Sequence, residues 1–348
     1  MHISRSVAAA AICILSMTSF ATAQSNRGAT GTLIVSNMND NTATIVDVAS
    51  SKVLATLPTG EGPHEVAASH DGRLAVVSNY GVRGKPGNSL TLIDVKSLSV
   101  VKTIDLKEYQ QPHGARFLPG DTILVVTAQA AKKVLFVDVR SGTVVKTLPT
   151  NGRTSHMLGL SANGDRIVTG NIPDATMSLL DLKNGGEPKI FRVAKQPEGI
   201  AITPDGSLSW VGSNRDSVVL VVNNNTGVAS DTLRGFGLPY RLAISPDGKR
   251  AVITDPVNAN VRVFDVATRK QLRSIEIPRD SLVATAEVPG SPSPEGVTIS
   301  ADSKWAFVTL QGRNRVITID IERGAIVAWA VTGTWSDGIA YSPMIRPR

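Results

Sequence analysis

The sequence predicts an all-β fold built as a ring of repeated units, and three observations lead to it. Short apolar and β-branched runs alternate with turn residues along most of the chain. A stretch holding four such runs recurs, mostly at intervals of about 42 to 49 residues. An incomplete copy stands near each end. A repeat of this length with four strands per copy is typical of a propeller blade, so we expect a seven-bladed β-propeller.

The clearest copy of the repeat spans residues 239–275. Asp247-Gly248 separates its first two runs, and Asp-Gly between apolar runs is a strong hairpin signal. Asp255-Pro256 interrupts the chain after the second run. Runs this short, with this composition, predict strands rather than helices. The four expected strands are residues 242–244, 251–254, 261–264 and 271–275.

The copies divide the chain into blades. Their openings lie near residues 63, 112, 155, 197, 239 and 294, and a seventh opening near 336 carries a first strand only. The three missing strands are expected at residues 33–37, 43–48 and 52–57. Residues 30–58 and 336–343 therefore share one blade, and this closure leaves no unpaired strand edge in the ring. We expect one propeller domain over residues 24–348.

Several strand segments resemble a known repeat family. The residues at 251–255 (AVITD), 75–79 (AVVSN) and 134–139 (VLFVDV) are similar to repeats of the YVTN family of β-propeller proteins. The resemblance extends over nearly the whole chain after residue 23. It implies the propeller fold, and the family includes surface-layer, periplasmic binding and suspected lactonase proteins. The Trp-Asp pair of cytosolic WD-type blades is absent from the sequence.

Residues 1–23 have the features of a signal peptide. Arg5 provides the positive charge, residues 7–15 form an apolar run, and Ala21-Thr22-Ala23 fits a cleavage site. We therefore expect an exported protein, periplasmic or extracellular, and no later segment predicts a membrane helix. Cleavage would remove Cys13, the single cysteine. The mature chain would then lack disulfides, thiolate metal sites, cysteine nucleophiles and covalent c-type haem.

Charge and motifs exclude several classes of function. The formal net charge is +7, but the basic residues are spread through turns, as at Lys132-Lys133. No basic run is interleaved with aromatic residues, so the chain has no specific nucleic-acid motif. The sequence also lacks a Gly-x-Ser-x-Gly elbow, a His-Glu-x-x-His motif and a phosphate-binding loop.

Two inserts, residues 80–89 and 279–293, lengthen connections expected at the same face, which favours that face for binding.

The candidate site consists of the second residue of each blade opening, where the openings begin at residues 63, 112, 155, 197, 239, 294 and 336. Each stands where the chain enters an innermost strand, so we expect all of them to encircle one mouth of the central channel. Arg116 is a cation in a column of otherwise small inner-strand residues, where a charge must be paired or face the channel. Arg241 and Glu65 occupy a column that is usually Gly. The ring consists of His64, His113, His156, Glu198, Tyr240, Glu295 and Asp337.

Three interpretations of this ring follow from its chemistry. The side chains can simply hydrogen-bond the backbone at the mouth. His64, His113 and His156 can instead hold one divalent metal ion and leave a position for water or substrate. Alternatively, one histidine acts as general base with Glu198 or Glu295 as acid.

Two hypotheses of function correspond to these interpretations. The first is non-catalytic binding of a small molecule or protein partner at the channel mouth. The alternative is a metal-assisted lactonase or lyase acting on an anionic small molecule or sugar acid. In that enzyme, the three histidines and Glu198 or Glu295 would carry the chemistry, and Arg116 would steer the anion.

Overall fold

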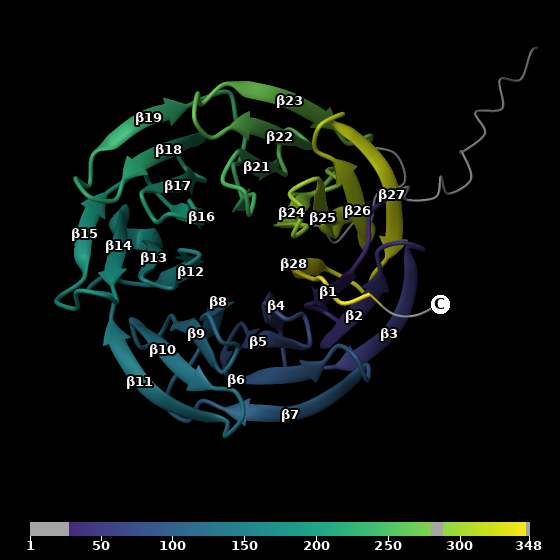
Figure 1. Ribbon diagram of the computed structural model, residues 1–348, viewed down its shortest axis with the longest axis horizontal. Helices are drawn as coiled ribbons and strands as arrows, with labels where there is room; N and C mark the ends of the chain where they lie inside the picture. Colours follow the sequence, from purple (N-terminus) through teal and green to yellow (C-terminus); the bar gives the residue numbers. More distant parts are fainter. Residues whose placement is uncertain (1–27, 280–287, 346–348) are drawn as a thin grey trace, which may run out of the picture.

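The structure is a computed structural model that describes residues 28–279 and 288–345. The predicted signal peptide, residues 1–23, lies outside these residues. Seven four-stranded antiparallel sheets form a ring around a central channel (Figure 1). The predicted fold class, an all-β seven-bladed propeller, is confirmed. Within the described residues, no helix is both long and apolar enough to cross a membrane.

Each blade is named here by its innermost strand, and its strands follow from the channel outward. The β28 blade holds β28 (Ser336–Ser342), β1 (Thr32–Asn37), β2 (Thr42–Asp47) and β3 (Lys52–Pro58). The β4 blade holds β4 (Pro63–Ala68), β5 (Leu74–Val82), β6 (Lys85–Asp94) and β7 (Ser99–Asp105). The β8 blade holds β8 (Pro112–Phe117), β9 (Ile123–Ala128), β10 (Lys133–Asp138) and β11 (Thr143–Pro149).

The other four blades repeat the arrangement. The β12 blade holds β12 (Ser155–Leu160), β13 (Arg166–Asn171), β14 (Thr176–Asp181) and β15 (Lys189–Arg192). The β16 blade holds β16 (Pro197–Ile202), β17 (Leu208–Ser213), β18 (Val218–Asn223) and β19 (Ala229–Leu233). The β20 blade holds β20 (Leu242–Ile244), β21 (Arg250–Asp255), β22 (Asn260–Asp265) and β23 (Gln271–Glu276). The β24 blade holds β24 (Pro294–Ile299), β25 (Trp305–Leu310), β26 (Arg315–Asp320) and β27 (Ala325–Val331). Single 3₁₀ turns at Ile172–Asp174 and Gln311–Arg313 follow β13 and β25.

The two ends of the chain meet in one blade, as the sequence predicted. β28 pairs antiparallel with β1, with Tyr341 opposite Leu33 and Ala340 opposite Ile34. Thr32 also donates its hydroxyl to the carbonyl of Met344 at 2.8 Å. Figure 1 shows β28 beside β1 on the inner side of the ring. The propeller is therefore closed by hydrogen bonds between its last and first strands.

The core lies between adjacent blades. The second and third strands of a blade are covered on both faces, and so their apolar residues run continuously, as in Leu124-Val125-Val126 of β9. The outermost strands have one face in solvent, and β7 and β11 each expose four of their seven residues. Side chains such as Leu90 and Leu135 from neighbouring blades join one cluster. Blade-to-blade packing thus supplies the apolar burial that one sheet alone cannot.

A repeated polar contact fixes the links between blades. Asn79 accepts the backbone N–H of Gly60 at 3.0 Å, and Asn37 accepts that of Gly333 at 2.9 Å. Asp255 does the same for Gly237 at 2.8 Å. The side chains of Asn37, Asn79 and Asp255 are all buried. These three side chains therefore have a structural role: each ties its own blade to the incoming chain.

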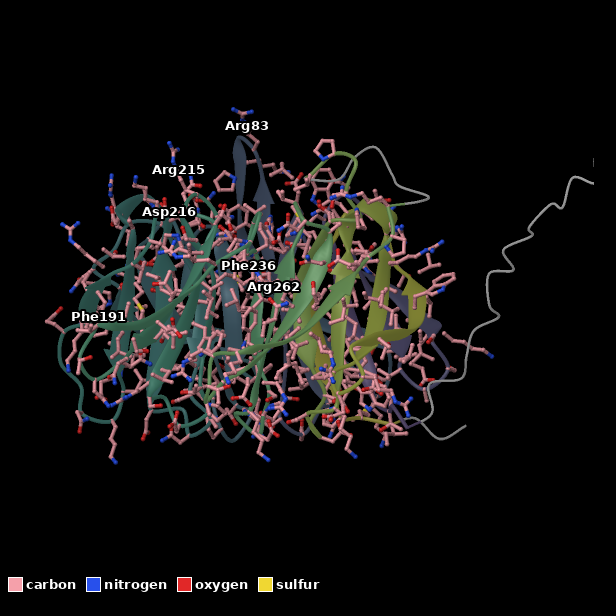
Figure 2. The ribbon with its side chains drawn as sticks, turned by 90° about the horizontal axis from the view of Figure 1, so that it is seen from above. Arg83, Phe191, Arg215, Asp216, Phe236 and Arg262 are labelled. Atoms are coloured by element: carbon pink, nitrogen blue, oxygen red, sulfur yellow. The ribbon has the colours of Figure 1, made fainter. Side chains whose placement is uncertain are left out.

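One hairpin departs from the regular repeat. β5 and β6 have 9 and 10 residues, whereas the second and third strands of the other blades have six each. The extra length comes from the predicted insert at residues 80–89. Figure 2 shows Arg83 at its tip, projecting above the face that also carries Arg215. Part of the second insert, residues 280–287, lies outside the described residues.

Candidate functional site

β-Bulges place the candidate ring residues at one end of the inner strands. In β4, Pro63 pairs with Asn79 and Val66 with Val77, so His64 and Glu65 together face a single residue, Ser78. β8, β12, β16, β24 and β28 show the same shift at their first residues. Bulges re-aim side chains and are common beside functional sites. In these six strands the bulge sets two residues of the inner strand opposite one residue of its neighbour and so re-aims their side chains.

Hydroxyl groups from the preceding blade hold the ring in position. Each donor stands next to the last residue of a second strand and points at the carbonyl of a ring residue in the next blade. Ser78 donates to His113 O at 2.8 Å, Thr127 to His156 O at 2.7 Å, Thr254 to Glu295 O at 2.8 Å, and Thr309 to Asp337 O at 2.8 Å. Ser36 makes the equivalent bond to His64 O. The ring is thus preorganised by the same contacts that join the blades.

Glycine at the third position allows the inner strands to approach closely. A Cβ on Gly338 would lie 2.3 Å from His64 O, and one on Gly296 would lie 2.2 Å from Asp337 O. Real Cβ atoms do not tolerate such distances. Glu65 and Arg241 are exceptions to this glycine column, and the structure brings them together across the channel.

Arg241 is the centre of an ion-pair network inside the channel. Its Nη2 lies 3.0 Å and its Nε 3.1 Å from Oε1 of Glu65, and its Nη1 lies 2.7 Å from Oε1 of Glu198. The three side chains are 4–11 % exposed. The network joins the neighbouring β16 and β20 blades to the β4 blade, which lies on the other side of the ring (Figure 1). It therefore spans the channel and fills it at this level.

The network continues through His156 to residues outside the predicted ring. Nε2 of His156 lies 2.8 Å from Oε1 of Glu198, and its Nδ1 lies 2.8 Å from Oε1 of Gln129. Gln129 in turn donates to the Tyr80 hydroxyl at 2.9 Å, and Gln111 donates to the same hydroxyl at 3.1 Å. Both nitrogens of His156 are thus engaged. Tyr80, Gln111 and Gln129 escaped the sequence analysis because they stand outside the repeated opening tripeptide.

The three histidines do come together. The rings of His113 and His156 lie 3.6 Å apart between centroids with an interplanar angle of 32°, and those of His64 and His113 lie 5.1 Å apart. His64 pairs with Asp337 at 3.0 Å, and its ring lies 4.7 Å from that of Tyr80. His113 is fully buried, and in the described part of the protein neither of its ring nitrogens has a hydrogen-bond partner.

Metal binding by His64, His113 and His156 stays a prediction. Across residues 28–279 and 288–345, no group of three His, Cys, Asp or Glu side chains is arranged to hold a metal ion. A metal bound by all three histidines would require His156 to release Gln129 or Glu198. The ring therefore shows histidines in contact with one another, with both ring nitrogens of His156 directed at protein partners.

The remaining ring residues complete a closed polar layer. Glu295 is fully buried at the start of β24, and Tyr240 lies beneath Arg241, whose guanidinium carbon is 4.4 Å from the ring centroid. Asp337 and Glu198 are also buried. At the level of the ring the channel is thus filled by side chains. His64, with 19 % of its side chain exposed, is more accessible than His156 at 13 %.

Burial and ion pairing shift the pKa values of Arg241 and of two ring residues, Glu198 and His113. Burial alone would raise the pKa of Glu198, but His156 and Arg241 outweigh it and hold that pKa well below its usual value. Burial would lower the pKa of Arg241, whereas Glu65, Tyr240 and Glu198 raise it well above normal. Burial, together with the charges of His156 and His64, lowers the pKa of His113 well below 6.5. His113 is consequently neutral at pH 7.

Because His113 is neutral in the folded protein, we expect the free energy of unfolding to depend on pH. Its pKa is lower in the folded than in the unfolded protein, so the unfolded state binds the extra proton as pH falls below about 6.5. The stability it contributes is complete above that pH and is lost at up to about 1.4 kcal/mol per pH unit below it. Denaturant unfolding from pH 8 to 5 should show a shallower loss in His113→Leu. Parallel curves for the two proteins would contradict this assignment.

A pocket lies above His64 on the hairpin side of the ring. It measures about 590 Å³ and is lined by the turn between β1 and β2, the long β5–β6 hairpin, and the segment before β8. His64 and Tyr80 contribute from the ring side, and Gln111 and Arg83 from the other walls. No Asp or Glu side chain of the described residues lines it. The insert expected to favour binding at this face therefore forms one wall of a pocket.

The structure separates Arg116 from the histidines. The residue lies in the second half of β8, and it lines a cavity together with the second halves of the other inner strands. The ring residues stand at the opposite ends of the same strands. The sequence analysis assigned Arg116 to steer an anion toward the histidines, because the sequence alone does not show depth along the channel.

No family model matches the chain, and no curated protein sequence does. Among solved structures, the chain is similar to a functionally unknown protein from Desulfotomaculum acetoxidans DSM 771, with a TM-score of 0.74, 15 % identity, and coverage of 90 % of this chain and 99 % of that one. It is also similar to Kuenenia stuttgartiensis hydrazine synthase, with a TM-score of 0.67, 18 % identity, and coverage of 83 % and 92 %. At these identities the likeness shows the fold alone.

Proposed function

We propose that the protein is an exported propeller of the YVTN type that binds a small organic anion in the pocket above His64. The observation that carries this proposal is the long β5–β6 hairpin, which builds a pocket of about 590 Å³ over an otherwise regular blade. That volume lies in the range of small-molecule sites. Export is inferred from the composition of residues 1–23.

The lining of the pocket indicates the class of ligand. Arg83 and His64 are its basic groups. His64 is already paired with Asp337 at 3.0 Å, and no Asp or Glu of the described residues is among those that line the pocket. Tyr80, Gln110 and Gln111 add hydroxyl and amide groups that can bind oxygen-rich molecules. Arg pairs with carboxylates through two parallel hydrogen bonds. A small carboxylic acid with additional hydroxyl groups, such as a sugar acid, fits this combination.

The geometry favours binding over catalysis. Two of the candidate acid–base groups, Glu198 and His156, are already paired with each other, and Glu198 is buried. Their arrangement rigidifies the floor of the pocket, as satisfied buried networks do. The histidine ring in this proposal supports the ligand site and does not react with the ligand.

A thermal-shift screen followed by calorimetry tests the proposal. Sugar acids and small hydroxy acids are compared with their uncharged analogues, and the expected result is saturable stabilisation by acids only. Arg83→Gln should weaken binding of the best acid about tenfold, whereas Arg215→Gln, an exposed arginine on the same face, should not (Figure 2). No stabilisation by any acid, or equal loss in both variants, would refute it.

Two further readouts separate binding from the metal-assisted alternative. The ligand recovered after incubation should be chemically unchanged, and elemental analysis of the purified protein should find no stoichiometric divalent metal. Consumption of the ligand together with metal that disappears in a His64→Ala/His113→Ala/His156→Ala variant would establish the enzyme instead.

A further inference from the structure

The half of the channel beyond the ion-pair layer contains a second cavity. It has a volume of about 250 Å³ and is bounded by the later residues of all seven inner strands. Most of these are small or aliphatic, such as Ala67, Gly159 and Ala243. Pro246, in the turn after β20, also lines it, which places the cavity toward the face opposite the histidines.

Arg116 is the single charged residue among those that line this cavity. Its Nη1 donates to the carbonyl of Ala115 at 2.7 Å, and no carboxylate of the described residues lies within ion-pair distance. Burial lowers the pKa of Arg116, although the charge of Glu65 acts in the opposite direction. Glu65 is already bound by two nitrogens of Arg241. A guanidinium in such surroundings is costly unless an anion pairs with it.

We propose that this cavity is a site for a small anion, held by Arg116 and entered from the face opposite the histidines. The Thr298 hydroxyl, in the same column of the inner strands, is a second polar group on the cavity wall. Because a water molecule takes up about 30 Å³, the cavity accommodates an anion such as sulfate, phosphate or a short carboxylate with a few waters. Arg offers the planar fork that these oxyanions prefer.

The proposed site is independent of the pocket above His64. The layer formed by Glu65, Arg241 and Glu198 fills the channel between them, and the two sites share no lining residue. Each site therefore has its own arginine. Arg83 serves one and Arg116 the other, so variants of the two residues are each other's controls.

Thermal unfolding with sulfate or phosphate as the probe tests the inference. Up to about 10 mM anion is compared with chloride at equal ionic strength, a range in which general salt effects on stability are small. The melting temperature of the parent protein should rise saturably, and Arg83→Met should behave in the same way. In Arg116→Met the dissociation constant should weaken at least tenfold, and in Arg116→Lys less so.

A second readout keeps the test decisive if the anion affinity is modest. Without anion, Arg116→Met should melt at a higher temperature than the parent, because it removes a partly buried charge that no carboxylate of the described residues pairs with. Equal sulfate and phosphate responses in the parent and Arg116→Met would overturn the proposal. So would a lower melting temperature of Arg116→Met in anion-free buffer.

Discussion

Replacing Arg241 with methionine is expected to lower the free energy of unfolding by about 3–5 kcal/mol. The substitution keeps the length of the side chain but leaves Glu65 and Glu198 as buried carboxylates without the cation between them. Breaking one member of a buried ion network is costly because the remaining charges stay desolvated. For a chain of this size the melting temperature should fall by roughly 5–15 °C.

The pH dependence of this variant identifies the cause. In the parent, His156 and Arg241 hold the pKa of Glu198 well below normal, so its stabilisation is present above about pH 4.5 and fades as pH falls further. In Arg241→Met the carboxyls lose their cation, so their protonation at low pH removes part of the destabilisation of the variant. The difference in stability between the two proteins should therefore shrink from pH 7 to pH 4.

A compensating variant provides the control. Glu65→Gln/Glu198→Gln/Arg241→Met removes all three charges while keeping similar volumes, and it should recover at least half of the lost stability. If this triple variant were as unstable as Arg241→Met alone, the packing of the arginine, and not its charge, would be what stabilises the layer.

The ring of blades could be predicted from the sequence because the information is local and repeated. Each Pro-Asp-Gly or Asn-Gly turn and each apolar run occurs within one hairpin, and repetition averages out irregular copies such as the one near 155. Blade closure followed from the same pattern, since only the segments at the two ends lacked partners. The register of β28 with β1 agrees with that interpretation.

The candidate site could be predicted only in part. The column of second residues marked which side chains face the channel, but not how they pair across it. Glu65 and Arg241 stand 176 positions apart. The sequence showed that both depart from the glycine column, but not that they pair with each other. The sequence also did not show depth along the strand: Arg116 is only three residues beyond His113, yet it lines a cavity that no ring residue lines. Such information depends on the assembled ring.

Deleting residues 336–348 is expected to unfold the propeller at physiological temperature or lower its melting temperature by more than 10 °C. The deletion removes β28, the innermost strand of its blade, and with it the buried side chains of Ile339, Ala340 and Ser342. β1 then loses one of its two partners, and the flanking strands β4 and β24 lose a neighbour on the channel side. An open ring also exposes an unpaired strand edge.

Two comparisons show whether closure itself is responsible. Deleting only residues 345–348 keeps β28 and the bond from Thr32 to Met344, so this protein should melt within about 2 °C of the parent. A synthetic peptide of residues 333–345 should bind the long truncation and raise its melting temperature, because it supplies the missing strand by antiparallel pairing with β1. A long truncation that melts like the parent would mean that the seven blades are held by side-by-side packing alone.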